Sequence, residues 1–282
     1  MKALVIGGSS FVGKRLVRAL QARDISVTVI SRTAMPDAGI RHIQCDRRDA
    51  VALAAATQNQ RWDLVYDHCC MNGAEAHAAA DILKDKTGHY LLTSSMCVYG
   101  WGIDLAETAF DPLSDDEPGG WQNTYAIGKR EAERVIARSG ITHTLVRLPI
   151  MLGSDDPEHR IEWHADRIAA GQPITANSGR RLSYTTAQHG ADSMAQLSQM
   201  GGMGALNISA DTSLTLAEFI GAIETATGRA AVLSGGDKSP FDTPGDQAMD
   251  NGRAARATLP RLGRDILLRE ISTVAALSGK SR

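Results

Sequence analysis

The 282-residue chain has few cysteines, no long apolar run and almost no net charge, and each absence excludes a class of protein. Its cysteines are Cys45, Cys69, Cys70 and Cys97, and none forms a C-x-x-C pair. The spacing therefore predicts neither a zinc site nor a disulfide framework, and we expect no metal site. No apolar stretch approaches the ~20 residues that cross a bilayer. Met1 leads into the chain without a charged leader or cleavage site, so we expect a cytoplasmic protein with no membrane contact.

The charged residues nearly cancel, because 30 basic residues face 32 acidic ones and leave a net charge of −2. Such a balance gives no overall field that would attract nucleic acid or anionic lipid. We therefore expect a small-molecule ligand and no nucleic-acid partner. The length allows two domains, or one doubly wound domain with an appended lobe.

The first twenty residues predict a strand, a glycine turn and a helix. Residues 3–6 are apolar, Gly7 and Gly8 follow, and apolar residues then recur at helical spacing. Such a turn lets a pyrophosphate approach the backbone at a helix N-terminus, although glycines in a βα turn can also serve sterics alone. Ser10 stands where many such turns have a middle glycine. The turn residues expected to bind a dinucleotide are Gly7, Ser9, Ser10, Phe11, Val12 and Gly13.

The second strand candidate, residues 26–30, ends at Ser31 and Arg32. An acid at this position bonds the ribose 2′-hydroxyl of NAD, whereas a basic group accommodates the 2′-phosphate of NADP. Because no acid is present, NADP(H) is favoured over NAD(H). The alternative is an exposed arginine that opens a loop. Lys14 and Arg15, just past the glycines, could also face that phosphate.

Further strands and helices alternate along the first half of the chain, which predicts parallel pairing with right-handed crossovers. The expected fold is an α/β, Rossmann-type doubly wound parallel sheet with a smaller C-terminal substrate-binding lobe. Asp46 and Asp49 follow the third strand, where an aspartate can cap the next helix or touch an adenine. The strand candidates are residues 41–45, 62–70, 89–93 and 141–148, and the helix candidates are residues 51–57, 73–86 and 125–139.

After residue 150 the periodicity loosens. Residues 101–120 are already rich in Asp, Glu, Gly and Pro and predict a long loop, as do residues 234–250. The predicted helices are 161–170, 191–200, 214–227 and 265–277, and the strand-like pieces are 180–186 and 206–209. The expected dinucleotide-binding domain spans residues 1–152, with 180–205 returning to it, and the substrate-binding lobe comprises residues 153–179 and 206–282.

Three residues form the strongest chemical constellation: Ser95, Tyr125 and Lys129. Tyr125 and Lys129 are four apart on one helix, so an ammonium lies beside a phenol and favours its ionised form. Ser95 follows the fifth strand, at the ligand-binding edge of an open α/β sheet, and its hydroxyl could stabilise charge on a substrate oxygen. Each element alone is commonplace, but together with an upstream nucleotide turn they predict a catalytic site.

At these motifs the sequence resembles the extended short-chain dehydrogenase/reductase family, in an atypical form of the NAD-dependent epimerase/dehydratase type. The resemblance implies that Ser95 polarises the substrate oxygen, Tyr125 exchanges its proton, and Lys129 bonds the nicotinamide ribose. It also implies that Asp46 touches the adenine and that Cys69 lies at the cofactor. The matching motifs are IGGSSFVG, Asp46-x-x-Asp49, Ser94-Ser95-x-x-Val98-Tyr99-Gly100, Tyr125-x-x-x-Lys129, Arg147-x-Pro149 and Leu206-Asn207-Ile208.

The sequence also departs from the family pattern. Met96 and Cys97 stand where sugar-nucleotide 4,6-dehydratases carry an Asp-Glu pair, so that dehydration lacks its acid and base. By analogy with relatives, helices 73–86 and 125–139 imply a homodimer. Residues that could contact substrate are Met96, Trp101, Trp163 and Tyr184, although each aromatic could equally pack in the core.

The leading hypothesis is an NADPH-dependent reductase that acts on a ketone, aldehyde or imine of a small metabolite, with Tyr125 as proton donor. The alternative is an NAD(P)-dependent epimerase of a nucleotide sugar or glycoside. A third hypothesis is a dinucleotide-sensing protein without catalysis. His68, near the end of the fourth strand, is either packed or at the cofactor edge.

Overall fold

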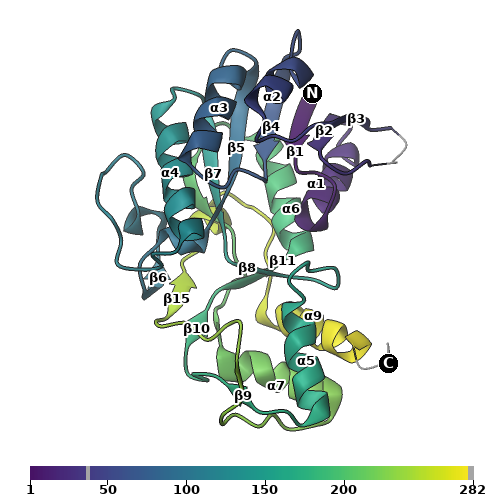
Figure 1. Ribbon diagram of the computed structural model, residues 1–282, viewed down its shortest axis with the longest axis vertical. Helices are drawn as coiled ribbons and strands as arrows, with labels where there is room; N and C mark the ends of the chain where they lie inside the picture. Colours follow the sequence, from purple (N-terminus) through teal and green to yellow (C-terminus); the bar gives the residue numbers. More distant parts are fainter. Residues whose placement is uncertain (36–38, 279–282) are drawn as a thin grey trace.

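The computed structural model describes residues 1–35 and 39–278, and it is built around a seven-stranded parallel sheet (Figure 1). The strand order is β12-β7-β5-β4-β1-β2-β3, so the order reverses between β1 and β4. This topology confirms the α/β, Rossmann-type fold expected from the alternating pattern. The strands are β1 (Lys2–Ile6), β2 (Ser26–Ser31), β3 (Arg41–Gln44), β4 (Trp62–Asp67), β5 (Thr87–Ser95), β7 (His143–Leu148) and β12 (Gly204–Asn207).

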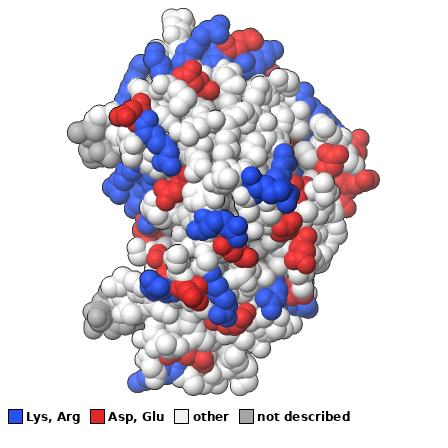
Figure 2. Space-filling view, turned by 180° about the vertical axis from the view of Figure 1, so that it is seen from behind, with Lys and Arg blue, Asp and Glu red and all other residues white. Residues whose placement is uncertain are grey.

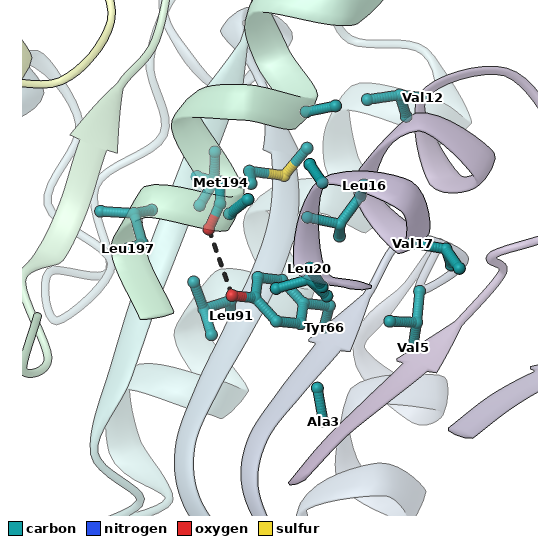
Figure 3. Close-up of a cluster of buried hydrophobic side chains, with 14 of the residues drawn as sticks. Ala3, Val5, Val12, Leu16, Val17, Leu20, Tyr66, Leu91, Met194 and Leu197 are labelled. Carbon is teal, nitrogen blue, oxygen red and sulfur yellow. Dashed lines mark hydrogen bonds between the residues drawn. The ribbon is translucent and has the colours of Figure 1, made fainter. Parts of the chain in front are cut away.

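Helices cover both faces of the sheet. On one face α1 (Phe11–Gln21) packs against α6 (Ala187–Gln196), and Figure 3 shows their apolar side chains meeting over β1 and β4. There Leu16 and Leu20 of α1 lie in one cluster with Met194 of α6, and Tyr66 of β4 donates a hydrogen bond of 3.2 Å to the Met194 carbonyl. The other face carries α2 (Ala50–Ala56), α3 (Gly73–Leu83) and α4 (Thr124–Arg138), with a second apolar cluster beneath them.

A second group of elements lies at the carboxyl end of the sheet (Figure 1). Its core joins α5 (Arg160–Ala170), α7 (Leu216–Thr227) and α9 (Arg264–Ser278). The shorter elements here and around the sheet are β6 (Gly102–Leu105), β8 (Ile150–Leu152), β9 (Ile174–Thr175), β10 (Arg181–Leu182), β11 (Tyr184–Thr186), β13 (Leu214–Thr215), β14 (Asp237–Lys238), β15 (Gln247–Met249), α8 (Gly252–Arg256) and the 3₁₀ turns Met96–Val98, Glu107–Ala109 and Leu197–Gln199. The division into two domains remains a prediction.

Several boundaries differ from the sequence expectation. Residues 101–120 were expected to be loop, but β6 lies within them because it pairs with β15, which itself lies in the Gly- and Pro-rich stretch 234–250. Helix α6 begins at Ala187 rather than residue 191, because the Thr186 side chain caps it by accepting the His189 N–H. Residues 279–282 of the expected lobe lie outside the described residues.

A buried arginine joins the sheet to the elements around it. Arg147, at the end of β7, is fully buried and binds both carboxylate oxygens of Glu133 on α4, at distances from 2.6 to 3.2 Å. Its remaining donors reach the Tyr99 hydroxyl and the carbonyls of Glu107 and Phe110. All five guanidinium N–H groups are therefore used, and α4 is fixed to β7.

Candidate active site

A cavity of about 520 Å³ opens at the carboxyl ends of β1 to β4, where the strand order reverses. Open α/β sheets bind their ligands at such a point. Its lining also includes three charged side chains that the sequence did not predict: Arg47, Arg48 and Glu75. Seven of the residues expected to bind a dinucleotide line this cavity: Gly7, Ser9, Ser10, Ser31, Arg32, Asp46 and Cys69.

The turn after β1 has the backbone geometry that a phosphate cradle needs. Gly7 has φ +91°, and a Cβ there would lie 2.3 Å from the Cys69 sulfur; a Cβ at Gly13 would lie 2.2 Å from the Gly7 carbonyl oxygen. The N-cap residue of α1, Ser10, makes no side-chain cap, whereas Asn72 caps α3 and Asn123 caps α4. The first N–H groups of α1 therefore remain available to an anion. Phe11 and Val12 are buried below the turn with Gly13.

The rim of the cavity is formed by the ends of β2 and β3. Arg32 is exposed there, and its guanidinium has no ion-pair partner among the described residues. The Ser31 hydroxyl donates to the Thr33 carbonyl and also contacts His42, so it is already engaged. Asp46 faces the cavity and is bound by Arg48.

The two aspartates after β3 have different roles. The Asp49 carboxylate accepts the N–H groups of Val51 and Ala52, each at 3.0 Å, and so caps α2. Asp46 lines the cavity instead. The sequence left both roles open; the structure shows the cap at Asp49, and the adenine contact of Asp46 stays a prediction.

Two basic residues face away from this rim. Lys14 and Arg15 both form ion pairs with Asp155, and the Arg15–Asp155 distance is 2.7 Å. The sequence suggested that they could face a cofactor phosphate, but their pairing with Asp155 directs them to the loop after β8. That partner lies 140 residues away in the chain, so spacing gave no sign of it.

Ser95, Tyr125 and Lys129 come from the end of β5 and the start of α4. The Lys129 ammonium lies 5.7 Å from the Tyr125 ring centre. It donates to the carbonyls of Cys70 at 2.7 Å and Thr93 at 2.9 Å, and is almost fully buried. The Ser95 hydroxyl oxygen accepts the Cys97 N–H at 3.2 Å. Lysine and tyrosine thus lie together beside the strand end that carries Ser95.

His68 lies between the glycine turn and β5. Its Nδ1 is 2.6 Å from the Thr93 hydroxyl, while its Nε2 is shielded from solvent and has no hydrogen-bond partner among the described residues. Burial lowers the pKa of His68 to about 4, with Lys129 adding to the effect, so the ring is neutral at pH 7. The end of a buried strand was the sequence signal that pointed to this histidine.

The residues expected to contact substrate lie in different surroundings. Met96 is buried beside Tyr99 and Met249, and Trp101 packs edge-on against Trp121 with ring centres 4.9 Å apart. Trp163 lies on α5, where the Arg167 guanidinium stacks over its ring at 4.0 Å. Neither Met96, Trp101 nor Trp163 lines the cavity described above.

Tyr184 is fully buried in an aromatic cluster. Its ring stacks on Phe219 with centres 5.5 Å apart and meets Phe241 edge-on at 5.6 Å. Burial raises the pKa of its hydroxyl far above the ordinary value. This packing accounts for Tyr184 without any ligand.

Within residues 1–35 and 39–278 there is no cluster of three or more His, Cys, Asp and Glu side chains suited to a metal ion. No helix in those same ranges has the length and apolar character needed to cross a bilayer. The fold, the uncapped helix after a glycine turn and the tyrosine–lysine pair together define a dinucleotide-binding α/β protein of the short-chain dehydrogenase/reductase class.

Comparison with known proteins defines the family. The model of the NAD dependent epimerase/dehydratase family matches residues 3–182, and the chain belongs to that family, whose extended short-chain dehydrogenase/reductase members are enzymes. The resemblance noted in the sequence is therefore confirmed. The chain is also 29% identical, over 204 residues, to the chloroplast stem-loop binding protein of 41 kDa b from Arabidopsis thaliana, covering 64% of this chain. It spans about half (50%) of the length of that relative.

Solved structures show the same fold at low identity. The UDP-glucose 4-epimerase of Thermus thermophilus, in complex with NAD, is 18% identical with a TM-score of 0.78, and each chain is covered completely (100%). The UDP-glucuronic acid 4-epimerase of Bacillus cereus, with UDP-glucuronic acid and NAD, is 15% identical with a TM-score of 0.78, covering 98% of this chain and 99% of that one. The dTDP-glucose 4,6-dehydratase DesIV of Streptomyces venezuelae, with NAD and TYD bound, is 19% identical with a TM-score of 0.78 and 96% coverage of both chains.

Proposed function

We propose that the protein is an NADPH-dependent oxidoreductase that reduces a carbonyl or imine of a small metabolite. The observation that carries the cofactor preference is Arg32, an unpaired cation within the described residues at the rim formed by β2 and β3. An acid that would bind the ribose 2′-hydroxyl of NAD is missing from residues 31–33.

The residues present fit a dinucleotide. Close approach at Gly7 and Gly13, together with the free N–H groups of α1, supports a pyrophosphate at this turn. The third proton of Lys129 remains for a ribose hydroxyl, because two of its three donors reach carbonyls. When bound, the cofactor supplies the hydride.

In this proposal the chain's own residues hold the substrate oxygen and supply a proton. The Ser95 oxygen accepts the Cys97 N–H, so its hydroxyl hydrogen remains to donate to the substrate oxygen as that atom gains negative charge. Tyr125 is 39% exposed at the start of α4, where its hydroxyl can donate the proton. Two carbonyls fix the Lys129 side chain, and its Nζ lies 5.7 Å from the centre of the Tyr125 ring.

An epimerase of a nucleotide sugar or glycoside is the second candidate. Supporting it, solved structures of similar fold include two nucleotide-sugar 4-epimerases in complex with NAD. Such an enzyme oxidises and re-reduces its substrate and so retains its cofactor. The same Tyr125 and Lys129 pair would serve both reactions, so cofactor preference separates them.

The third candidate is a dinucleotide-binding protein without catalysis. The Arabidopsis relative is named as a stem-loop binding protein, which raises nucleic-acid binding as one such role. On the face shown in Figure 2, acidic and basic side chains are interleaved rather than gathered by sign. On that face, the pattern offers no basic patch that would follow a phosphate backbone.

One experiment separates the three candidates. The purified protein is tested for bound dinucleotide, then for oxidation of NADPH and NADH with a panel of ketones, aldehydes and imines, and for epimerisation of UDP-sugars. We expect turnover with NADPH, and the Tyr125→Phe variant should lose about 10²–10⁴-fold in kcat while still binding NADPH. Copurifying NAD with epimerised UDP-sugar would favour the second candidate. Unchanged biological activity in Tyr125→Phe would favour the third.

A further inference from the structure

Three charged residues meet at the outer end of the cavity: Arg32, Asp46 and Arg48. Arg32 follows β2, and the other two follow β3. These strands pair in parallel, with Ser31 opposite Gln44, and the Cys45 N–H donates to the Ser31 carbonyl at 3.1 Å. The residues after both strands therefore emerge side by side at one edge of the sheet.

Arg48 holds Asp46 through several hydrogen bonds. Its Nε donates to the two carboxylate oxygens at 3.1 and 3.2 Å, its Nη2 donates to Oδ2 at 2.6 Å, and its backbone N–H donates to Oδ1 at 3.0 Å. Partners two residues apart lose little freedom in making these contacts. Hydrogen bonds from Arg48, assisted by the charge of Arg32, hold the pKa of Asp46 far below its usual range. Asp46 is therefore ionised at neutral pH, and the three side chains carry a net charge of about +1.

Other nearby cations are already compensated. Arg47 turns inward, where it forms ion pairs with Asp67 and Glu75. Lys14 and Arg15 are held by Asp155. Among the residues that the structure describes, Arg32 is thus the cation left to bind an added anion at this rim, provided that the neighbouring Asp46 carboxylate does not repel that anion.

We propose that Arg48 is a specificity-determining positioning residue, which cancels the charge of Asp46 and so allows the 2′-phosphate of the cofactor to bind Arg32. The inference rests on the proposed preference for NADP(H). Without Arg48, the free Asp46 carboxylate would lie beside a dianionic phosphate and would instead accept hydrogen bonds from a ribose. Arg48 acts through Asp46, to which its Nε–H, one Nη2–H and its backbone N–H all donate.

The test measures binding of two adenosine probes that differ only in the 2′-phosphate: adenosine 2′,5′-bisphosphate and adenosine 5′-phosphate. Affinities are measured by calorimetry for the wild type, Arg48→Gln, Asp46→Asn/Arg48→Gln and the control Arg41→Gln, which changes an exposed arginine at the opposite end of β3. Arg48→Gln should reduce bisphosphate affinity about tenfold while changing monophosphate affinity less than about threefold. The double variant should recover the wild-type affinity ratio, since the repelling carboxylate is also gone.

The outcomes separate this inference from the proposed function. A wild type that binds both probes equally would contradict the NADP preference itself. A wild type that prefers the bisphosphate, with an unchanged ratio in Arg48→Gln, would overturn the role of Arg48. A double variant as weak as the single variant would also overturn it, because Arg48 would then bind the phosphate directly. Added salt should reduce the preference of the wild type for the bisphosphate over the monophosphate. The same salt should change the affinity of Arg48→Gln for the monophosphate less than it changes the wild-type affinity for the bisphosphate.

Discussion

At the scale of single residues, the same side-chain type has different roles according to its partners. Tyr125 is partly exposed beside an ammonium, Tyr99 is buried with its hydroxyl hydrogen-bonded to Asn207, and Tyr184 is buried with no partner for its hydroxyl among the described residues. A phenol without a partner in an apolar cluster is destabilising. Burial alone therefore does not identify a functional tyrosine.

Tyr184→Phe should be neutral or should stabilise the fold by up to about 1–2 kcal/mol, because it removes a buried polar group and keeps the ring stacked on Phe219. Thermal unfolding measures the stability, and substrate KM measures the predicted substrate contact. A KM raised severalfold with unchanged stability would instead support Tyr184 as a substrate ligand.

At the scale of elements, α4 connects the proposed chemistry to the sheet. It carries Tyr125 and Lys129 in its first turns and Glu133 two turns after Tyr125, where Arg147 of β7 binds it. Both partners of this ion pair are fully buried. The pair fixes α4 along its axis and therefore positions the tyrosine.

Glu133→Gln should destabilise the protein by about 3–5 kcal/mol, because the Arg147 charge stays buried without its counter-charge. Urea unfolding of this variant is compared with Glu131→Gln, an exposed neighbour on the same helix. The Glu131 carboxylate accepts the Gly73 N–H at 3.3 Å, a bond that the Gln amide oxygen can keep, so we expect a change within about 0.5 kcal/mol. Equal effects in the two variants would contradict a structural role for the Arg147–Glu133 pair.

The elements also show which parts of the structure the sequence could predict. Two predictions rest on residues close together in the chain, and the observed elements agree with both. They are the strand, turn and helix of residues 2–21 and the placing of Tyr125 and Lys129 four residues apart on one helix. The pairing of β6 with β15 and the ion pair of Arg15 with Asp155 join residues about 140 positions apart, which local periodicity does not reveal. Arg48 binds Asp46, only two residues away. The charged run of residues 46–49 nevertheless does not reveal that Arg47 turns inward to Asp67 while Arg48 stays at the rim.

At the scale of the whole molecule, buried neutral histidines link stability to pH. His164 is fully buried among aromatic rings and hydrogen-bonds Ser239 and the Arg160 carbonyl, and His89 is buried on β5. Burial lowers the pKa of both to about 4, from an ordinary value of 6.5. The unfolded chain therefore binds protons at a higher pH than the folded chain does.

The free energy of unfolding should hold its full contribution from these histidines above about pH 6.5. It should fall as the pH drops toward 4, by up to about 3 kcal/mol for each of His89 and His164. Urea unfolding at pH 7.5, 6.5, 5.5 and 4.5 measures this loss. His164→Asn should reduce the slope, whereas His77→Asn, which changes a histidine on the outer side of α3, should retain it. A free energy of unfolding that stays constant from pH 7.5 to 4.5 would contradict the lowered pKa values of His89 and His164.

The position of the edge strand β12 late in the chain has a consequence for folding during synthesis. Its Asn207 accepts a hydrogen bond from the Tyr99 hydroxyl at 2.6 Å and donates to the carbonyls of Leu105 and Asp250. The strand that β12 pairs with, β7, ends much earlier in the chain, at Leu148. During synthesis, which proceeds from the N-terminus, β7 would emerge from the ribosome well before this partner. Until Asn207 emerges, β7 presents an open edge on which a second nascent chain could add a strand. Chaperones that shield strand edges should therefore matter most during that interval of translation.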